Sequence, residues 1–227
     1  MNRRDELAAN LAAVRERMAD AARAAGRSPD ELTLVAVTKT FPAEDVALLA
    51  DLGVADVGEN RAQEAAAKHE QVGTPLRWHF VGSLQRNKAN LVASFADVVH
   101  SVDRPELVGA LDRARDVQLD VLVQVSLDGS PGRGGAPCDA APALADRVAA
   151  SERLRLRGVM AVAPLDEDPN RAFARLAEVA GRIRADHPQA TWISAGMSGD
   201  LEAAVAAGAT HVRIGTALLG RRSPPVR

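Results

Sequence analysis

Short apolar runs alternate with helical patterns along almost the whole chain, and this alternation constrains the fold more than any other feature of the sequence. Most runs are rich in valine, isoleucine and leucine, which is typical of buried strands. The helical spacing between runs indicates parallel strands joined by crossover helices. The expected strands are TLVAVT (33–38), ADVGE (55–59), RWHFVG (77–82), DVVHSV (97–102), DVLVQVS (120–126), LRGVMAVA (156–163), TWISAG (191–196) and HVRIG (211–215).

The segments around and between these strands carry apolar residues at helical spacing. In the first 26 residues the spacings are four, three and four, which place the apolar side chains on one helical face. These residues are Leu7, Leu11, Val14 and Met18. Further helices are expected from Pro42 to Gly53, over about 60–71, 84–93, 105–117, 139–151, 169–186 and 199–207, and from Thr216.

Eight strand–helix units in 227 residues predict an α/β fold, a single (β/α)8 TIM barrel with an extra N-terminal helix. Such barrels have about 250 residues, and a doubly wound open sheet is the alternative. Because no interdomain linker is visible, residues 1–227 are expected to form one domain, with 221–227 as a disordered tail. The Gly/Pro-rich segment DGSPGRGGAP (128–137) predicts a mobile loop after the fifth strand.

Composition narrows the class of protein. The net charge of −2 gives no general attraction to nucleic acid or to an anionic membrane surface. Cys138 is the only cysteine, which excludes an internal disulfide and suits a reducing cytoplasm. No apolar run approaches the roughly 20 residues that span a bilayer. We therefore expect a cytoplasmic protein whose partner is a small molecule, with no nucleic-acid or membrane partner.

In a TIM barrel the active site lies at the C-terminal ends of the strands, so the residues there are the candidates for function. Lys39 ends the first strand, and Asn60 follows the second. His79 lies on the third strand and Met160 on the sixth. The seventh strand leads into SAGMSGD (194–200), and the eighth is the start of HVRIGTALLG (211–220).

The eighth strand carries an arginine that should face the barrel interior. Side chains alternate along a strand, so Arg213 and Gly215 share one face. A buried guanidinium needs an anion or an acceptor to offset its desolvation, and an ion pair with Glu59 is as good an expectation as a ligand. Gly215 permits close backbone approach, and Thr216 should begin a short helix whose free N–H groups favour an anion.

The loop GMSGD (196–200) supplies a second anion-binding element, with two glycines and the hydroxyl of Ser198. The alternative is that Ser198 is only the N-cap of the next helix. Loops after strands seven and eight commonly build phosphate sites in these barrels, so the two loops together predict a phosphate site.

Lys39 adds a chemical function to this site. A neutral lysine amine attacks carbonyls and forms Schiff bases. Beside a phosphate site, such a lysine suits a phosphorylated aldehyde. Pyridoxal 5′-phosphate and a phosphosugar in a Schiff-base aldolase both meet this description.

Six ordered motifs point to a family: VAVTKTFP, GENRAQEA, WHFVGSLQRNK, HSVDRPEL, RGVMAVAP and GMSGDLEAAVAAGATHVRIGTALLG. From about residue 7 to 220 the chain resembles the pyridoxal-phosphate homeostasis proteins (YggS/PROSC-like). The resemblance implies one barrel similar to the N-terminal domain of alanine racemases, with pyridoxal 5′-phosphate on Lys39. It implies that Arg213 faces the pyridine nitrogen and that the cofactor's other contacts, to its phosphate and its face, come from Ser198, Gly215, Thr216, Asn60, His79 and Met160.

The loop after the fifth strand departs from the family. Members often carry an asparagine and a KxG-like element there, whereas this chain has Ser126 and then LDGSPGRGG, with Arg133 in place of a lysine. The resemblance therefore gives segment 128–137 no role in handing over cofactor.

Arg213 and the absence of tyrosine favour a carrier over an enzyme. A guanidinium offers only donors, which leaves a facing ring nitrogen unprotonated and weakens the ring as an electron sink. Racemases commonly add a tyrosine from a second domain as a second base. We expect a monomeric carrier and buffer of the cofactor, not an efficient enzyme, in transient contact with pyridoxal-phosphate-dependent apoenzymes. A racemase-type enzyme with His79 as second base, and an aldolase-like enzyme, are the alternatives.

Overall fold

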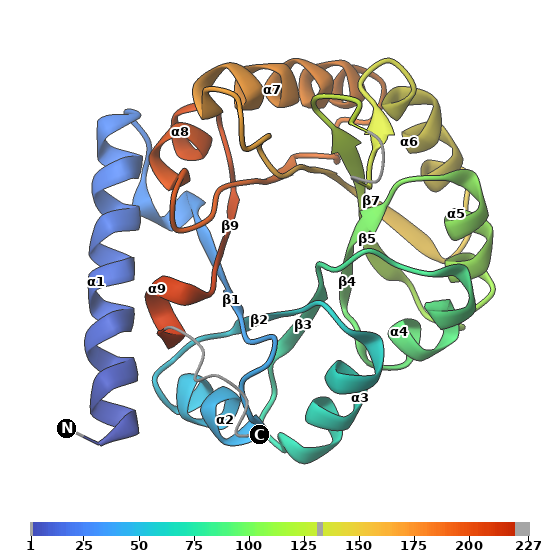
Figure 1. The fold of residues 1–227 in the computed structure, drawn as a ribbon. Helices are drawn as coiled ribbons and strands as arrows, with labels where there is room; N and C mark the ends of the chain where they lie inside the picture. Colours follow the sequence, from blue (N-terminus) through green and yellow to red (C-terminus); the bar gives the residue numbers. More distant parts are fainter. Residues whose placement is uncertain (1, 131–133, 221–227) are drawn as a thin grey trace.

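In the computed structural model, which describes residues 2–130 and 134–220, eight parallel strands close into a barrel (Figure 1). β1 pairs with both β2 and β9, and β4 pairs with β5, so the sheet has no open edge between them. The (β/α)8 prediction is confirmed, and the doubly wound open sheet is wrong. The barrel strands are β1 (Thr33–Val37), β2 (Asp56–Glu59), β3 (Arg77–Phe80), β4 (Val98–Val102), β5 (Leu119–Ser126), β7 (Leu154–Met160), β8 (Trp192–Ser194) and β9 (His211–Ile214).

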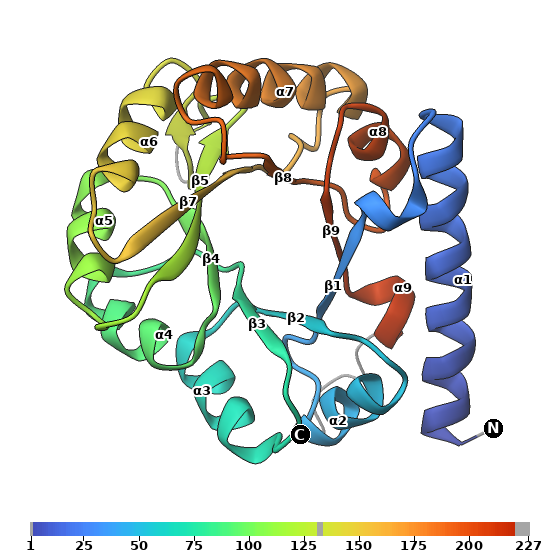
Figure 2. The same ribbon diagram turned by 180° about the vertical axis from the view of Figure 1, so that it is seen from behind.

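Helices follow the strands and cover the outside of the barrel (Figure 2). They are α2 (Ala43–Asp51), α3 (Ala62–Gln71), α4 (Ala89–Phe95), α5 (Pro105–Asp112), α6 (Ala141–Ala149), α7 (Pro169–Asp186), α8 (Leu201–Ala206) and α9 (Thr216–Leu219), with 3-10 turns at Pro29–Glu31 and Arg86–Lys88. α5 ends five residues before the predicted 117. A two-residue strand that was not predicted, β6 (Ala136–Pro137), pairs with β5 inside the expected loop 128–137. Residues 221–227 lie outside the described residues.

The extra N-terminal helix, α1 (Arg3–Ala24), lies along the outside of the barrel beside α8 and α9 (Figure 1). It buries the predicted face of Leu7, Leu11, Val14 and Met18. Asn2 caps its first turn by accepting a hydrogen bond from the N–H of Asp5 at 2.9 Å. Every described helix is too short or too polar to cross a bilayer.

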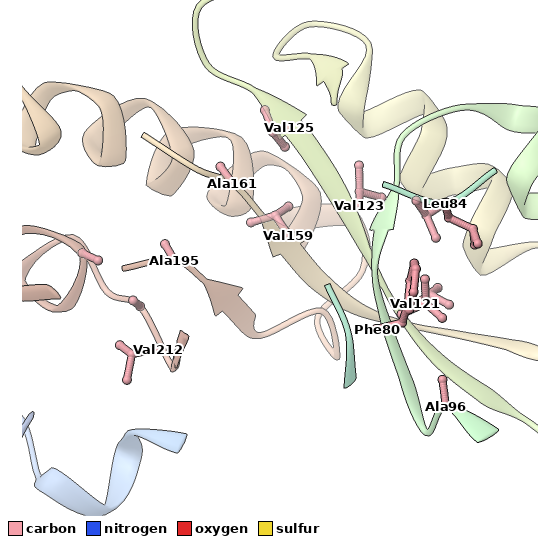
Figure 3. Packing of buried hydrophobic residues seen from close by; sticks show 14 of the residues in the cluster. Phe80, Leu84, Ala96, Val121, Val123, Val125, Val159, Ala161, Ala195 and Val212 are labelled. Carbon is pink, nitrogen blue, oxygen red and sulfur yellow. The ribbon is translucent and has the colours of Figure 1, made fainter. Parts of the chain in front are cut away.

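The main hydrophobic core lies between the strands and the helices (Figure 3). Val121, Val123 and Val125 alternate along β5 and point outward into this layer, as Val159 does from β7. Burying one such side chain contributes about 1.5–3 kcal/mol.

The barrel interior differs from the outer layer in its polarity. Val98, Leu122 and Met160 form a small apolar cluster there, with Trp192 packed against it. In most TIM barrels the interior is filled by branched apolar side chains. Here the inward positions also hold histidines, a serine and an arginine.

Candidate functional site

Lys39 follows the end of β1 in a segment fixed by a buried ion pair. The side chain of Lys39 is half-buried. The hydroxyl of the preceding Thr38 donates to Glu59 Oε1 at 2.6 Å, and Lys68 Nζ donates to the Thr38 carbonyl at 2.9 Å. Lys68 Nζ also lies 2.5 Å from Glu59 Oε1. The backbone before Lys39 is therefore held on two sides.

The residue after Lys39 is also constrained. Thr40 has a φ of 70°, in the left-handed region that non-glycine residues rarely occupy. Its N–H donates to Glu64 Oε1 at 2.6 Å, which holds this conformation. Such backbone strain is concentrated at functional sites. Between them, the contacts of Thr38 and Thr40 fix the path of the chain through Lys39.

Glu59 forms this ion pair through one carboxylate oxygen, Oε1. Burial raises the pKa of the Glu59 carboxyl, while the hydrogen bonds from Lys68 and Thr38 oppose that rise. Glu59 Oε2 is buried and has no hydrogen-bond partner among the described residues. The expectation that Glu59 pairs with Arg213 is wrong, because Glu59 sits on the outer face of the barrel wall with Lys68.

Arg213 faces the barrel interior, as predicted, and is buried. Its Nη1 donates to Ser194 Oγ at 2.7 Å, and its Nη2 donates to the Ala161 carbonyl at 2.9 Å. Within the described part of the chain no carboxylate lies at ion-pair distance from it. Burial lowers the pKa of Arg213 to about 10, opposed by the charge of Asp200, so the group is cationic at neutral pH.

The end of β9 lies against the end of β1. A Cβ at Gly215 would lie 3.3 Å from the Val37 carbonyl oxygen, so a side chain there would press on the backbone that leads to Lys39. Thr216 begins α9, as expected, and Gly215 accepts the first hydrogen bonds of that helix. The first N–H groups of α9 have no partner within the helix itself.

The glycine–serine loop, residues 196–200, lies beside β9. The Gly196 carbonyl accepts a hydrogen bond from the Arg213 N–H at 2.9 Å. Ser198 is half-buried, and its carbonyl accepts from Arg17 Nη1 of α1 at 2.7 Å. The alternative that Ser198 caps α8 is wrong, since the cap residue is Asp200. This leaves the Ser198 hydroxyl free of a capping role.

The other predicted residues lie at different depths. Asn60 is half-buried just after β2, and its backbone approaches Gly82 so closely that a Cβ there would overlap the Asn60 carbonyl. Met160 is 2% exposed in the inner apolar cluster. His79 is fully buried inside the barrel. The structure thus gathers Lys39, Asn60, Ser198, Arg213, Gly215 and Thr216 at the C-terminal ends of the strands, with Met160 and His79 deeper in the interior.

A chain of buried polar groups was missed by sequence reasoning. His79 Nε2 lies 2.8 Å from Asp56 Oδ1, and His79 Nδ1 lies 2.8 Å from His100 Nε2. His100 Nδ1 in turn lies 2.9 Å from Ser194 Oγ, which Arg213 contacts. The signal was available, because strand alternation puts each of these residues on the inward face with Arg213. The described residues contain no cluster of three side chains able to hold a metal ion.

The chain is similar in sequence and in structure to known proteins. Residues 5–223 match the family model of the alanine racemase N-terminal domain. A protein of Mycobacterium bovis named pyridoxal phosphate homeostasis protein is 48% identical, over 97% of this chain and 95% of the relative. Its namesake in Escherichia coli K12 is 41% identical, over 96% of this chain and 97% of the relative. The solved structure of PipY from Synechococcus elongatus with PLP bound has a TM-score of 0.82 at 32% identity, covering 94% of this chain and 100% of PipY.

Proposed function

The chain belongs to the family of pyridoxal phosphate homeostasis proteins, and we propose on this premise that it binds pyridoxal 5′-phosphate through a Schiff base with Lys39 and acts as an intracellular carrier and buffer of that cofactor. The observation that carries the proposal is the pairing of β1 with β9. It supports the proposal because β1 leads directly to Lys39 and its neighbour β9 carries Arg213 and leads to Gly215, so the amine and the buried cation come from adjacent strands.

The donor set at this end suits pyridoxal 5′-phosphate. Arg213 has five N–H donors, and its hydrogen bonds to Ser194 and Ala161 engage one donor on each of Nη1 and Nη2. The rest suit an acceptor such as a pyridine nitrogen. Backbone N–H groups of the glycine–serine loop and of Thr216 suit a phosphate. Met160 and Asn60 would border the ring, whereas His79 would act through His100.

Little in the site would exploit the cofactor for catalysis. An arginine at the ring nitrogen supplies no proton, so the ring would withdraw electrons weakly. The chain has no tyrosine to serve as a second base. His79 is enclosed between Asp56 and His100, which removes the racemase alternative's second base from the reach of a substrate. We propose a non-catalytic role for these reasons.

We propose that the protein works as a cytoplasmic monomer that meets apoenzymes only transiently. Val162, Leu165 and Met197 follow β7 and β8 at the cofactor end of the barrel, and Leu165 is 90% exposed. These apolar side chains offer a small contact surface beside the proposed site. The single cysteine suits a reducing compartment. Light scattering measures the mass of the purified protein alone and in the presence of an apoenzyme. The first measurement tests the monomer, and the second tests the contact with the apoenzyme.

Borohydride labelling tests the Lys39 assignment. The chain has only three lysines, Lys39, Lys68 and Lys88, so peptide mapping is unambiguous. The protein is loaded with pyridoxal 5′-phosphate, its absorbance spectrum is recorded, and the adduct is reduced and mapped. We expect the label on Lys39, because Lys68 is buried in its ion pair.

Lys39→Ala should abolish the label and the visible absorbance while leaving the thermal unfolding temperature close to that of the wild type, because the side chain is half-buried at the rim. Lys88→Ala is the matched control and should load normally. A label on Lys68 or Lys88 in the wild type would overturn the site, and absence of any label would overturn the function.

A further inference from the structure

A continuous line of hydrogen bonds crosses the barrel interior from Arg213 on β9 to the Asp56 carboxylate on β2, the strand on the other side of β1. The order is Arg213, Ser194, His100, His79 and Asp56, with successive separations of 2.7, 2.9, 2.8 and 2.8 Å. Ser194 and both histidines are 0% exposed. Solvent does not reach these three groups, so each of their protons must have an acceptor within the line, whereas the Asp56 side chain at its end is 15% exposed.

The groups at the two ends of the line, Arg213 and Asp56, determine which atom donates and which accepts in every hydrogen bond between them. The Asp56 carboxylate only accepts, so His79 Nε2 donates to it. His79 Nδ1 must then accept from His100 Nε2, and His100 Nδ1 must accept from the Ser194 hydroxyl. Ser194 Oγ accepts from Arg213. Burial lowers the pKa of both imidazoles, in agreement with the neutral forms that this direction requires.

All donors therefore point from the cation toward the carboxylate. Aligned hydrogen bonds polarise one another, so the charge of Asp56 strengthens Ser194 as an acceptor for Arg213. This matters because Arg213 is buried without a carboxylate at ion-pair distance among the residues described. A buried cation normally needs such a partner. The charge of Asp200 acts on Arg213 directly, and Asp56 adds a second counter-charge through three neutral groups.

We propose that Asp56, His79 and His100 are positioning residues that fix the charge and orientation of Arg213, and through Arg213 select a ligand with an acceptor ring nitrogen. The inference rests on the proposed function, because it takes the ring of pyridoxal 5′-phosphate as the group that Arg213 meets. It assigns discrimination at the ring nitrogen to residues that never touch the ligand.

The test compares two ligands that differ at one atom. Pyridoxal 5′-phosphate has the ring nitrogen, and its 1-deaza analogue has a C–H there. The dissociation constants of both are measured for the wild type and for Asp56→Asn, which keeps an acceptor for His79 but removes the charge. We expect the preference for the nitrogen ligand to fall by at least about fivefold, the lower end of typical coupling between sites. The affinity for the deaza analogue should stay within twofold.

Two further variants isolate the line itself. In a His100→Leu background the line is already broken, so adding Asp56→Asn should change the preference no further. Ser101→Ala is the matched control, because Ser101 is buried next to His100 on β4 but its hydroxyl has no hydrogen-bond partner among the described residues. It should leave both dissociation constants at the wild-type values.

The outcomes separate the inference from the function on which it rests. Unchanged preference in Asp56→Asn, equal weakening of both ligands, or loss of cooperative unfolding would each show that the line serves only structure, and each would overturn the inference. A wild type that binds neither ligand at Lys39 would instead overturn the proposed function.

Discussion

Acid should unfold this protein through the histidines inside its barrel. His79, His100 and His211 are buried, and burial is the main cause that lowers the pKa of each imidazole. For His211 the pKa falls to about 3, with the charge of His79 as the next cause. In the unfolded chain a histidine titrates near pH 6.5. Below that pH the unfolded chain binds more protons than the folded one, so stability is complete above pH 6.5 and falls as the pH falls.

The size of the effect follows from proton linkage. Each histidine that is charged when unfolded and neutral when folded removes about 1.4 kcal/mol per pH unit. His211 alone should remove roughly 2 kcal/mol between pH 6.5 and 4.5. With His79 and His100 the limiting slope is about 4 kcal/mol per unit, against a total stability of about 5–15 kcal/mol. Glu59 acts in the opposite direction, because its pKa is raised by burial, and offsets part of the loss.

Urea unfolding followed by circular dichroism, from pH 7.5 to pH 5, measures this slope. His211→Gln should reduce it by about 1.4 kcal/mol per unit, the contribution of one histidine. Met160→Leu is the control, because it alters the same interior without a titrating group and should shift stability equally at every pH. Stability that stays flat below pH 6.5, or a His211→Gln slope equal to that of the wild type, would refute the reasoning.

Three further predictions concern other charges. Lys68→Met leaves the Glu59 carboxylate buried and unpaired, and should lower the free energy of unfolding by about 3–5 kcal/mol in urea. Adding Glu59→Gln should restore part of that stability. If the single and the double variant lost the same stability, the ion-pair role would be contradicted. Arg17→Ala releases the carbonyl in the glycine–serine loop and should weaken binding of pyridoxal 5′-phosphate but not of pyridoxal, by titration, with Arg23→Ala on the same helix as control. Arg213→Glu should increase deuterium incorporation at the α-carbon of alanine per bound cofactor; wild-type exchange at about 1–10³ per second would favour a racemase.

The fold could be predicted from the sequence because its pattern is repeated and local. Each of the eight barrel strands lies within three residues of the apolar run that predicted it, and α7 matches the predicted 169–186 at both ends. β6 escaped prediction because Ala136–Pro137 has no alternation to read and pairs only through its position beside β5. α5 ends early at Asp112, although helical spacing continues to 117, because propensity is a weak guide to where a helix stops.

The sequence predicted which residues belong to the candidate site, but it did not predict which groups they contact. Alternation placed Arg213 inside the barrel, but it could not choose between Glu59 and a ligand as its partner. The choice depends on which wall of the barrel Glu59 faces, and Lys68 reaches Glu59 from α3, nine residues along the chain. Likewise, the position of His79 along its strand predicts a place at the barrel mouth. Its depth in the interior depends on how the strands tilt around the closed barrel.

The polar interior implies that the two faces of each strand have different tasks. The outward side chains supply stability, and the inward side chains position charged and polar groups. At the end of the barrel away from Lys39, Asp120 is buried and binds both Arg77 and Arg155, so charged groups occupy inward positions there too. Buried ion pairs contribute little net stability, because desolvation offsets their attraction. The outer layer of valine, leucine and phenylalanine must therefore supply most of the folding free energy. Inward positions are then free to hold groups such as Arg213, whose orientation matters more than their contribution to stability.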